Sequence, residues 1–248
     1  MSSKASLFVL LPALFLVAWK SALPVAGPVA AQPILVDDFE SYRVDGLPTK
    51  WKFIDGQQKL VPVTEEIMSR EEYFVVQREQ GNKFLRAVTK DRAHRLLLSN
   101  EDLGGWDLER HPFLSWRWRA LRLPKGARED EDRLNDTGAA IYVTFSRDWL
   151  GRPRSIKYTY SSTLPVGTVV SYGRLKVIVA SSGADGIGRW RSIERNVVDD
   201  YRNVFGGEPP ARPISVMLWS DSNSVHDVAE VDFDDIMLAT QSGAASAR

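Results

Sequence analysis

Two short apolar segments, one towards each end of the chain, are interrupted by adjacent carboxylates and constrain the fold most. They are residues 34–42 (ILVDDFESY) and 228–238 (VAEVDFDDIML). In the second segment the apolar residues before Asp234 alternate as in a β-strand, but Ile236 and Leu238 fall on the opposite parity. A β-bulge near Asp234 explains this change. Because a carboxylate in an apolar strand is costly unless it reaches water or a cation, we expect the two segments to pair as neighbouring strands.

The carboxylates of these two segments have two open interpretations. Several carboxylate oxygens brought together by strand pairing favour a hard cation, and Ca²⁺ fits that ligand chemistry best. The predicted metal ligands are Asp37, Asp38, Glu40, Asp234 and Asp235. The alternative is that the Asp pairs cap strand ends and face solvent, with no ion bound.

Short segments of alternating apolar and polar residues recur through the chain and predict an all-β fold. The clearest is residues 113–121, where Trp116 and Trp118 point to one side, and Arg117 and Arg119 to the other. We expect the tryptophans in the core and the arginines on a solvated face, with a role in ligand contact as the alternative. Further strands are predicted at residues 51–54, 73–78, 83–89, 96–98, 139–145, 156–160, 169–172, 174–180, 190–196 and 214–220.

One segment, residues 197–205, has helical instead of strand periodicity. Asp199 and Asp200 lie in its first turn, and Gly206 and Gly207 follow its end. Together with the strands it predicts an antiparallel β-sandwich of the jelly-roll type with one short docked helix. The charged run 128–136 is expected to form a mobile loop, and the glycine-rich run 181–189 a hairpin loop.

The N-terminal residues 1–31 have the features of an export signal. Lys4 precedes the apolar run 7–19, and small side chains at residues 29–31 come before Gln32, as a signal peptidase requires. The run is too short to favour a permanent membrane span, although an uncleaved anchor is the alternative. The chain has no cysteine, which excludes disulfides and thiolate metal sites and fits a periplasmic or extracellular protein.

The remaining residues divide into one predicted domain, 32–240, and a small polar tail, 241–248, expected to be disordered. Lysine plus arginine and aspartate plus glutamate both total 32. This balance provides no overall field to attract nucleic acid or an anionic membrane.

The chain resembles a family of uncharacterised bacterial exported proteins catalogued as domain of unknown function 3047. The residues that carry the resemblance are Asp38-Phe39-Glu40, residues 114–118 (LSWRW), residues 135–145, Arg195-Asn196-Val197, Asp200-Tyr201, Phe205-Gly206 and residues 231–238. This resemblance implies an exported, β-rich protein and no particular activity. The two terminal segments are also similar to those of galactose-binding-like jelly-roll domains, including many carbohydrate-binding modules. That similarity implies a structural calcium ion where the first and last strands meet.

The sequence signals no catalytic constellation. His94, His111 and His226 lack metal-ligand spacing, and there is no G-x-S-x-G motif. Acidic pairs such as Glu65-Glu66 are plentiful, but nothing in the sequence selects a catalytic pair.

We therefore expect an exported, non-catalytic β-sandwich that binds a glycan or another cell-envelope component. The candidate ligand contacts are Trp149, Tyr158, Tyr160, Trp219, Asp221 and Asn223. Trp149 lies in the predicted loop 146–154 and serves either as a sugar platform or as a lid folded back on the core. A glycoside hydrolase or polysaccharide lyase on the same scaffold is the alternative function, and a structural envelope protein that binds another protein is a third.

Overall fold

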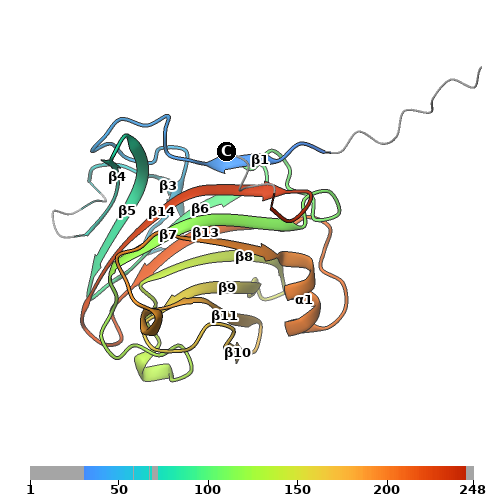
Figure 1. Cartoon of the computed structure of the whole chain (residues 1–248). Coiled ribbons are helices and arrows are strands. Elements are labelled where there is room, and N and C mark those ends of the chain that lie inside the picture. The colour runs from blue at the N-terminus through green and yellow to red at the C-terminus, as the bar shows by residue number, and fades with distance from the viewer. Residues whose placement is uncertain (1–30, 58, 67, 69–71, 244–248) are drawn as a thin grey trace, which may run out of the picture. The chain divides into compact units, whose positions relative to one another are not determined.

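Two β-sheets pack face to face in the computed structural model, which describes residues 31–57, 59–66, 68 and 72–243 (Figure 1). The six-stranded sheet has the order β12 (Arg191–Asn196), β7 (Phe113–Arg122), β14 (Val228–Ala239), β5 (Asn82–Lys90) and β4 (Tyr73–Glu79), with β1 (Ile34–Asp37) also paired to β14. The eight-stranded sheet has the order β10 (Val169–Tyr172), β11 (Leu175–Ser182), β9 (Pro153–Ser161), β8 (Ala139–Arg147), β13 (Ser215–Asp221), β6 (Ala93–Ser99), β2 (Lys52–Ile54) and β3 (Leu60–Pro62). The prediction of an all-β, jelly-roll-like sandwich is confirmed.

The two terminal segments pair as the sequence predicted. Strand β1 runs antiparallel to β14, with Ile34 opposite Leu238 and Asp37 opposite Ile236 (Figure 1). The register of β14 against β7 shifts between Asp234 and Met237, and Asp235 has a positive φ of 47°. Because of this β-bulge, Val231 and Phe233 face the core before it, and Ile236 and Leu238 face the core after it.

The core is built around four stacked aromatic rings from facing strands. Trp116 and Trp118 of β7 contact each other edge to face, with ring centroids 5.2 Å apart. Each of these rings also contacts a tyrosine of β9, Tyr158 for Trp116 and Tyr160 for Trp118, both with centroids 5.6 Å apart. Aromatic rings bury large apolar areas, so this stack joins the two sheets strongly.

Helix α1 (Val197–Phe205) begins and ends where the sequence predicted. The Asn196 side chain accepts hydrogen bonds from the backbone N–H groups of Val198 and Asp199, an N-cap. Tyr201 of the helix packs against Phe145 of β8, with ring centroids 4.7 Å apart. The helix is thus docked on the core through its apolar face.

Several local predictions need correction. Strands β9 and β11 are parallel, whereas the sequence predicted antiparallel pairs throughout. The glycine-rich run after β11 is not a hairpin loop, because it leads from the eight-stranded sheet to β12 in the six-stranded sheet. The charged run 128–136 is anchored by Glu129, which is fully buried and accepts hydrogen bonds from Thr137 and Ser161.

The predictions about the two chain ends fall largely on residues that are not described. The signal peptide, residues 1–31, is described only at Ala31, and the tail 241–248 only as far as Gly243. Within that described part of the tail, Ser242 and Gly243 donate hydrogen bonds to Glu194 of β12. In the described part of the chain, no helix has the length and hydropathy needed to cross a membrane.

Candidate functional site

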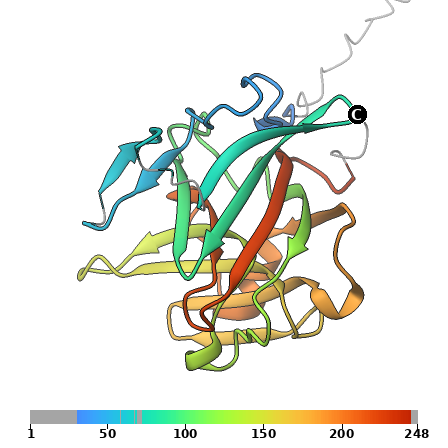
Figure 2. The ribbon, with the colours of Figure 1, turned by 90° about the vertical axis from the view of Figure 1, so that its left-hand side faces the viewer.

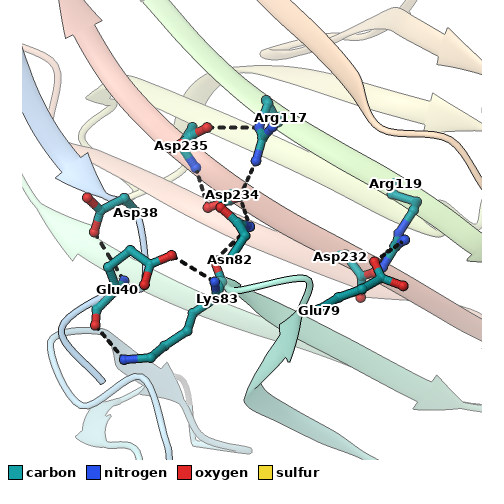
Figure 3. Close-up of polar contacts among 10 residues, drawn as sticks. All are labelled: Asp38, Glu40, Glu79, Asn82, Lys83, Arg117, Arg119, Asp232, Asp234 and Asp235. Atoms are coloured by element: carbon teal, nitrogen blue, oxygen red, sulfur yellow. Dashed lines mark hydrogen bonds and ion pairs between the residues drawn. The ribbon is translucent and has the colours of Figure 1, made fainter. Parts of the chain in front are cut away.

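The outer face of the six-stranded sheet carries a ladder of opposite charges. Because Trp116 and Trp118 point into the core, Arg117 and Arg119, which alternate with them along β7, must point outward. The register of β7 with β14 places Arg117 opposite Asp234 and Arg119 opposite Asp232. Cross-strand pairs of opposite charge stabilise a sheet and hold both side chains in one orientation. Figure 3 shows these arginines and carboxylates side by side.

Arg119 is held by two carboxylates. Its Nη2 donates to Asp232 Oδ2 over 2.7 Å, and its Nη1 donates to Glu79 Oε2 of β4 over 2.6 Å. Asp232 has no exposed surface and also accepts from Arg86 Nε over 2.7 Å. The hydrogen bond to Asp232, opposed by burial, raises the pKa of Arg86. A buried carboxylate between two guanidinium groups is fully compensated, so these side chains have little freedom to move.

Arg117 joins the site to the β-bulge. Its Nη2 donates to Asp234 Oδ2 over 2.6 Å, and its Nε lies 2.8 Å from Asp235 Oδ2. Asn82 of β5 donates to the same oxygen of Asp234 over 2.8 Å. Burial raises the pKa of Asp234 to about 6, although the hydrogen bonds from Asn82 and Arg117 oppose that rise.

Trp190 lies across both arginines. The guanidinium carbon of Arg117 is 5.1 Å from the centroid of the indole ring, and that of Arg119 is 4.9 Å away. The ring also meets Phe84 of β5 edge to face, with centroids 5.5 Å apart. The preceding loop is fixed to the sheet because the Gly188 N–H donates to the Ala120 carbonyl over 2.7 Å. Cation–π contacts of this kind hold the indole in a defined orientation.

These side chains line an open pocket of about 420 Å³. The lining residues are Glu79, Gln80, Asn82, Phe84, Arg117, Arg119 and Trp190. The β4–β5 hairpin turn forms one wall, and its residues Gln80 and Gly81 have positive φ angles of 51° and 91°, as a tight two-residue hairpin requires. The volume and the mixture of aromatic and planar polar groups fall in the range of small-ligand sites.

The five predicted metal ligands form separate hydrogen-bonded groups. Asp37 accepts hydrogen bonds from the Phe39 N–H, the Tyr42 hydroxyl and the Trp51 indole, at 2.8–2.9 Å. The other four are satisfied elsewhere: Asp38 and Glu40 accept from the Glu40 and Lys83 N–H groups, and Asp234 and Asp235 face Arg117 (Figure 3).

No group of three or more His, Cys, Asp or Glu side chains among the described residues is arranged to hold a metal ion. The Arg117 guanidinium supplies the positive charge that the sequence assigned to calcium. The residues present therefore do not fit one ion shared by all five carboxylates, and a calcium ion stays a prediction.

The six predicted ligand contacts do not form one site. Tyr158 and Tyr160 are fully buried in the ring stack, so their assignment to a ligand surface was wrong. Trp149 lies at the tip of the β8–β9 hairpin and is 88% exposed, which rules out the alternative that it folds back as a lid. Trp219 of β13 pairs with Ala140 at the start of β8, whereas Trp149 lies in the turn after the end of β8. The two tryptophans are therefore separated by the length of β8.

Trp219 lines a second open pocket of about 520 Å³ on the eight-stranded sheet. Arg95 of β6 lies over its ring, 5.0 Å from the centroid, and His94 Nε2 lies 3.2 Å from Glu72 in the same pocket. Asp221, two residues after Trp219, is buried, and burial raises its pKa to about 6. Asn223 is exposed in the following loop.

Sequence reasoning did not single out Trp190, Glu79, Gln80, Asn82 or Phe84. The parity of β5 carried a usable signal, because Asn82, Phe84 and Arg86 share the face opposite to the buried Leu85 and Ala87. The sequence predicted that Arg117 and Arg119 lie on a solvated face. For Arg119 this prediction was wrong, because the residue is almost completely buried.

A match to the family described as "Protein of unknown function (DUF3047)" covers residues 61–237, more than half of the 248-residue chain. The chain belongs to the DUF3047 family. The matched region contains every residue that lines the Trp190 pocket. A search of curated proteins gave no match.

Solved structures with a similar arrangement of strands include two carbohydrate-binding modules of Clostridium thermocellum. The family 30 module of the cellulosomal cellulase Cel9D-Cel44B has 12% identity and a TM-score of 0.45, covering 86% of this DUF3047 chain and 100% of the module. The family 11 module of Lic26A-Cel5E has 11% identity and a TM-score of 0.43, covering 86% and 97%. The exolytic PL7 alginate lyase AlyA5 of Zobellia galactanivorans has 9% identity and a TM-score of 0.38, covering 79% and 97%. Similarities of this size do not identify a function.

Proposed function

We propose that this protein binds an uncharged, hydroxyl-rich glycan in the Trp190 pocket. The observation that carries the proposal is an indole ring beside guanidinium, amide and carboxylate groups in one open pocket. An aromatic ring provides a flat apolar surface for the apolar face of a sugar ring, and planar polar groups donate to and accept from its hydroxyls. The arginines are already held by carboxylates, so binding does not have to order them.

The charge balance of the pocket selects against acidic polysaccharides. Arg117 faces Asp234 and Asp235, and Arg119 faces Glu79 and Asp232. Arg86, which also reaches Asp232, faces Glu230. Each of these guanidinium groups is therefore already paired with carboxylates, so a uronate or sulfate group entering the pocket would have to compete with those carboxylates for the arginines.

The geometry favours binding over glycoside cleavage. Both retaining and inverting glycosidases use a pair of carboxyl groups on either side of the bond that breaks. Glu79 is the only carboxylate among the residues that line this pocket. Asp232 and Asp234 are buried and face the arginines, so they contribute to positioning rather than to contact with a ligand.

The proposal includes export to the periplasm or the cell exterior. The motivation is the apolar run 7–19 followed by small residues before Gln32. N-terminal sequencing of the protein recovered from the cell envelope is expected to begin at Gln32. Recovery of the full-length chain from the cytoplasm alone would contradict this part of the proposal.

The binding proposal is tested by retention on an array of neutral and acidic polysaccharides. We expect the intact protein to bind a neutral polysaccharide, and Trp190→Ala to weaken that binding at least ten-fold. Trp190→Phe keeps an aromatic face and is expected to retain part of the affinity. Thermal melting of each variant separates loss of the site from loss of the fold.

Two other tryptophans provide matched controls. Trp219→Ala changes the second pocket, and Trp149→Ala changes an exposed side chain outside both pockets. Both variants are expected to bind as the wild type does. An array on which the intact protein binds nothing, or only acidic polymers, would overturn the proposal. Loss of binding in Trp219→Ala but not in Trp190→Ala would move the site to the eight-stranded sheet.

A further inference from the structure

The tip of the β8–β9 hairpin exposes two adjacent apolar side chains. Trp149 is 88% exposed and Leu150 is 55% exposed. Figure 2 shows this hairpin, drawn in yellow-green and yellow, projecting away from the neighbouring strands. Single exposed apolar residues are ordinary, but a tryptophan and a leucine together on a protruding turn form a surface suited to a partner.

The turn that carries them pairs four of the five backbone N–H groups of residues 148–152 within itself. Asp148 Oδ1 accepts from the N–H groups of Leu150 and Arg152, at 3.0 and 2.9 Å. The Gly151 N–H donates to the Asp148 carbonyl, and the Gly151 carbonyl accepts from Arg147 Nη1, both over 2.9 Å. A loop that enters an apolar medium must not bring unpaired backbone groups with it, because each would lose its water without replacement. This turn meets that condition at Asp148, Gly151 and Arg152 and at the Leu150 N–H, so only the outermost backbone groups of its tip would need partners among the lipid headgroups.

The tip is surrounded by positive charge although the chain as a whole is neutral. The basic residues at the tip end of the β8–β9 hairpin and in the adjacent β10–β11 turn are Arg147, Arg152, Arg154 and Arg174. The single carboxylate among them, Asp148, is 2.8 Å from Arg152 Nε and 3.9 Å from Arg174 Nε. The four arginines and the one carboxylate therefore leave an excess of three positive charges around the β8–β9 tip and the β10–β11 turn. Basic side chains near a membrane are attracted to anionic headgroups, each by about 1 kcal/mol.

We propose that the β8–β9 tip docks the protein on the surface of an anionic phospholipid bilayer, with Trp149 and Leu150 inserted at the headgroup boundary. Tryptophan is favoured at that boundary because its ring is apolar and its N–H is polar. A glycan fits the tip less well, because sugar sites are concave and converge several polar groups on the ligand. Here the polar groups of Asp148 and Arg152 bond to each other and to the turn instead.

The absence of cysteine from the chain allows a direct test in the full-length protein. Leu150→Cys, labelled with an environment-sensitive fluorophore, is mixed with vesicles of phosphatidylcholine alone or with phosphatidylglycerol added. We expect a blue shift with the anionic vesicles that weakens in high salt, and quenching by nitroxide-labelled lipid. Because the readout is local, the apolar run near the N-terminus does not produce it. Asn223→Cys, an exposed position in another loop, carries the same label as the matched control and is expected to show no shift.

The role of the indole is tested by adding Trp149→Ala to the labelled protein. We expect the vesicle concentration needed for half of the blue shift to rise at least ten-fold. Equal shifts at positions 150 and 223, or no shift with anionic vesicles, would overturn the proposal. A shift produced by a neutral polysaccharide but not by vesicles would also overturn it and assign the tip to a glycan. These outcomes are independent of the Trp190 pocket, because none of its lining residues is altered.

Discussion

Replacing Asp232 by alanine is expected to destabilise the protein more than any removal of an exposed ion pair. Asp232 is fully buried and accepts hydrogen bonds from Arg86 and from Arg119, so its loss leaves two guanidinium groups without their shared partner. Breaking a buried ion pair by removing one partner costs about 3–5 kcal/mol. Arg119 keeps Glu79 at 2.6 Å and Arg86 keeps Glu230 at 3.3 Å, which places the expected loss at the lower end, about 3 kcal/mol.

Urea unfolding of Asp232→Ala and wild type measures this loss directly. In a domain of this size about 3 kcal/mol corresponds to a fall in Tm of about 6–12 °C. The urea midpoint is expected to fall without a change in the slope of unfolding free energy against urea. Arg128→Ala is the control, because its ion pair with Asp130 is exposed at the surface, and a small effect is expected.

A double-mutant cycle with Arg119→Met then isolates the coupling between Asp232 and Arg119. A loss in Asp232→Ala no larger than that in the Arg128→Ala control would refute the reasoning that burial makes this ladder stabilising.

Three further predictions concern the helix cap, a buried carboxyl and the calcium ion. Asn196→Ala removes the side-chain acceptor for the N–H groups of Val198 and Asp199 and is expected to cost about 1 kcal/mol in urea unfolding, whereas Asn223→Ala should be neutral. Burial raises the pKa of Asp221 to about 6, so the folded protein holds a proton that the unfolded chain releases near its ordinary pKa of 3.8. This contribution to stability is present below pH 4 and is lost as the pH rises through 6. The Tm of the wild type minus the Tm of Asp221→Asn should therefore fall between pH 4 and pH 7. A difference in Tm that does not change with pH would contradict the raised pKa. The predicted calcium ion is tested by melting the protein in Ca²⁺ and in EDTA: a bound ion raises Tm in Ca²⁺, and equal values, as the pairing of Arg117 with Asp234 and Asp235 favours, would contradict the ion.

Local signals determined which parts of the fold the sequence could predict. Helix α1 was predicted with its observed bounds because its cap, its apolar spacing and its terminal glycines all lie within a dozen residues. Trp116 and Trp118 were assigned to the core because alternation along one strand is sufficient for that inference. Strand β3 was missed because Leu60–Pro62 is too short to show a period.

The candidate site depends on non-local pairing, which no single segment encodes. The sequence indicated that the carboxylates of β1 and β14 are close, but it did not show that Arg117 of a third strand would lie beside Asp234. Trp190 reaches the site because a loop crosses from one sheet to the other, a connection that the sequence reading took for a hairpin. Tyr158 and Tyr160 were assigned to the ligand surface, whereas their parity with the buried Ile156 already indicated the core face.

The position of β14 within its sheet has a consequence for how the chain matures. Strand β14 lies between β7 and β5 and also pairs with β1, so three earlier strands depend on a partner from the end of the sequence. The six-stranded sheet is complete only when β14 is in place, and the pairs that β14 makes with β1, β5 and β7 join residues far apart in the sequence. Closure of this sheet around β14 is therefore expected to be a late step of folding, because β1, β5 and β7 lack their shared neighbour until β14 is in place.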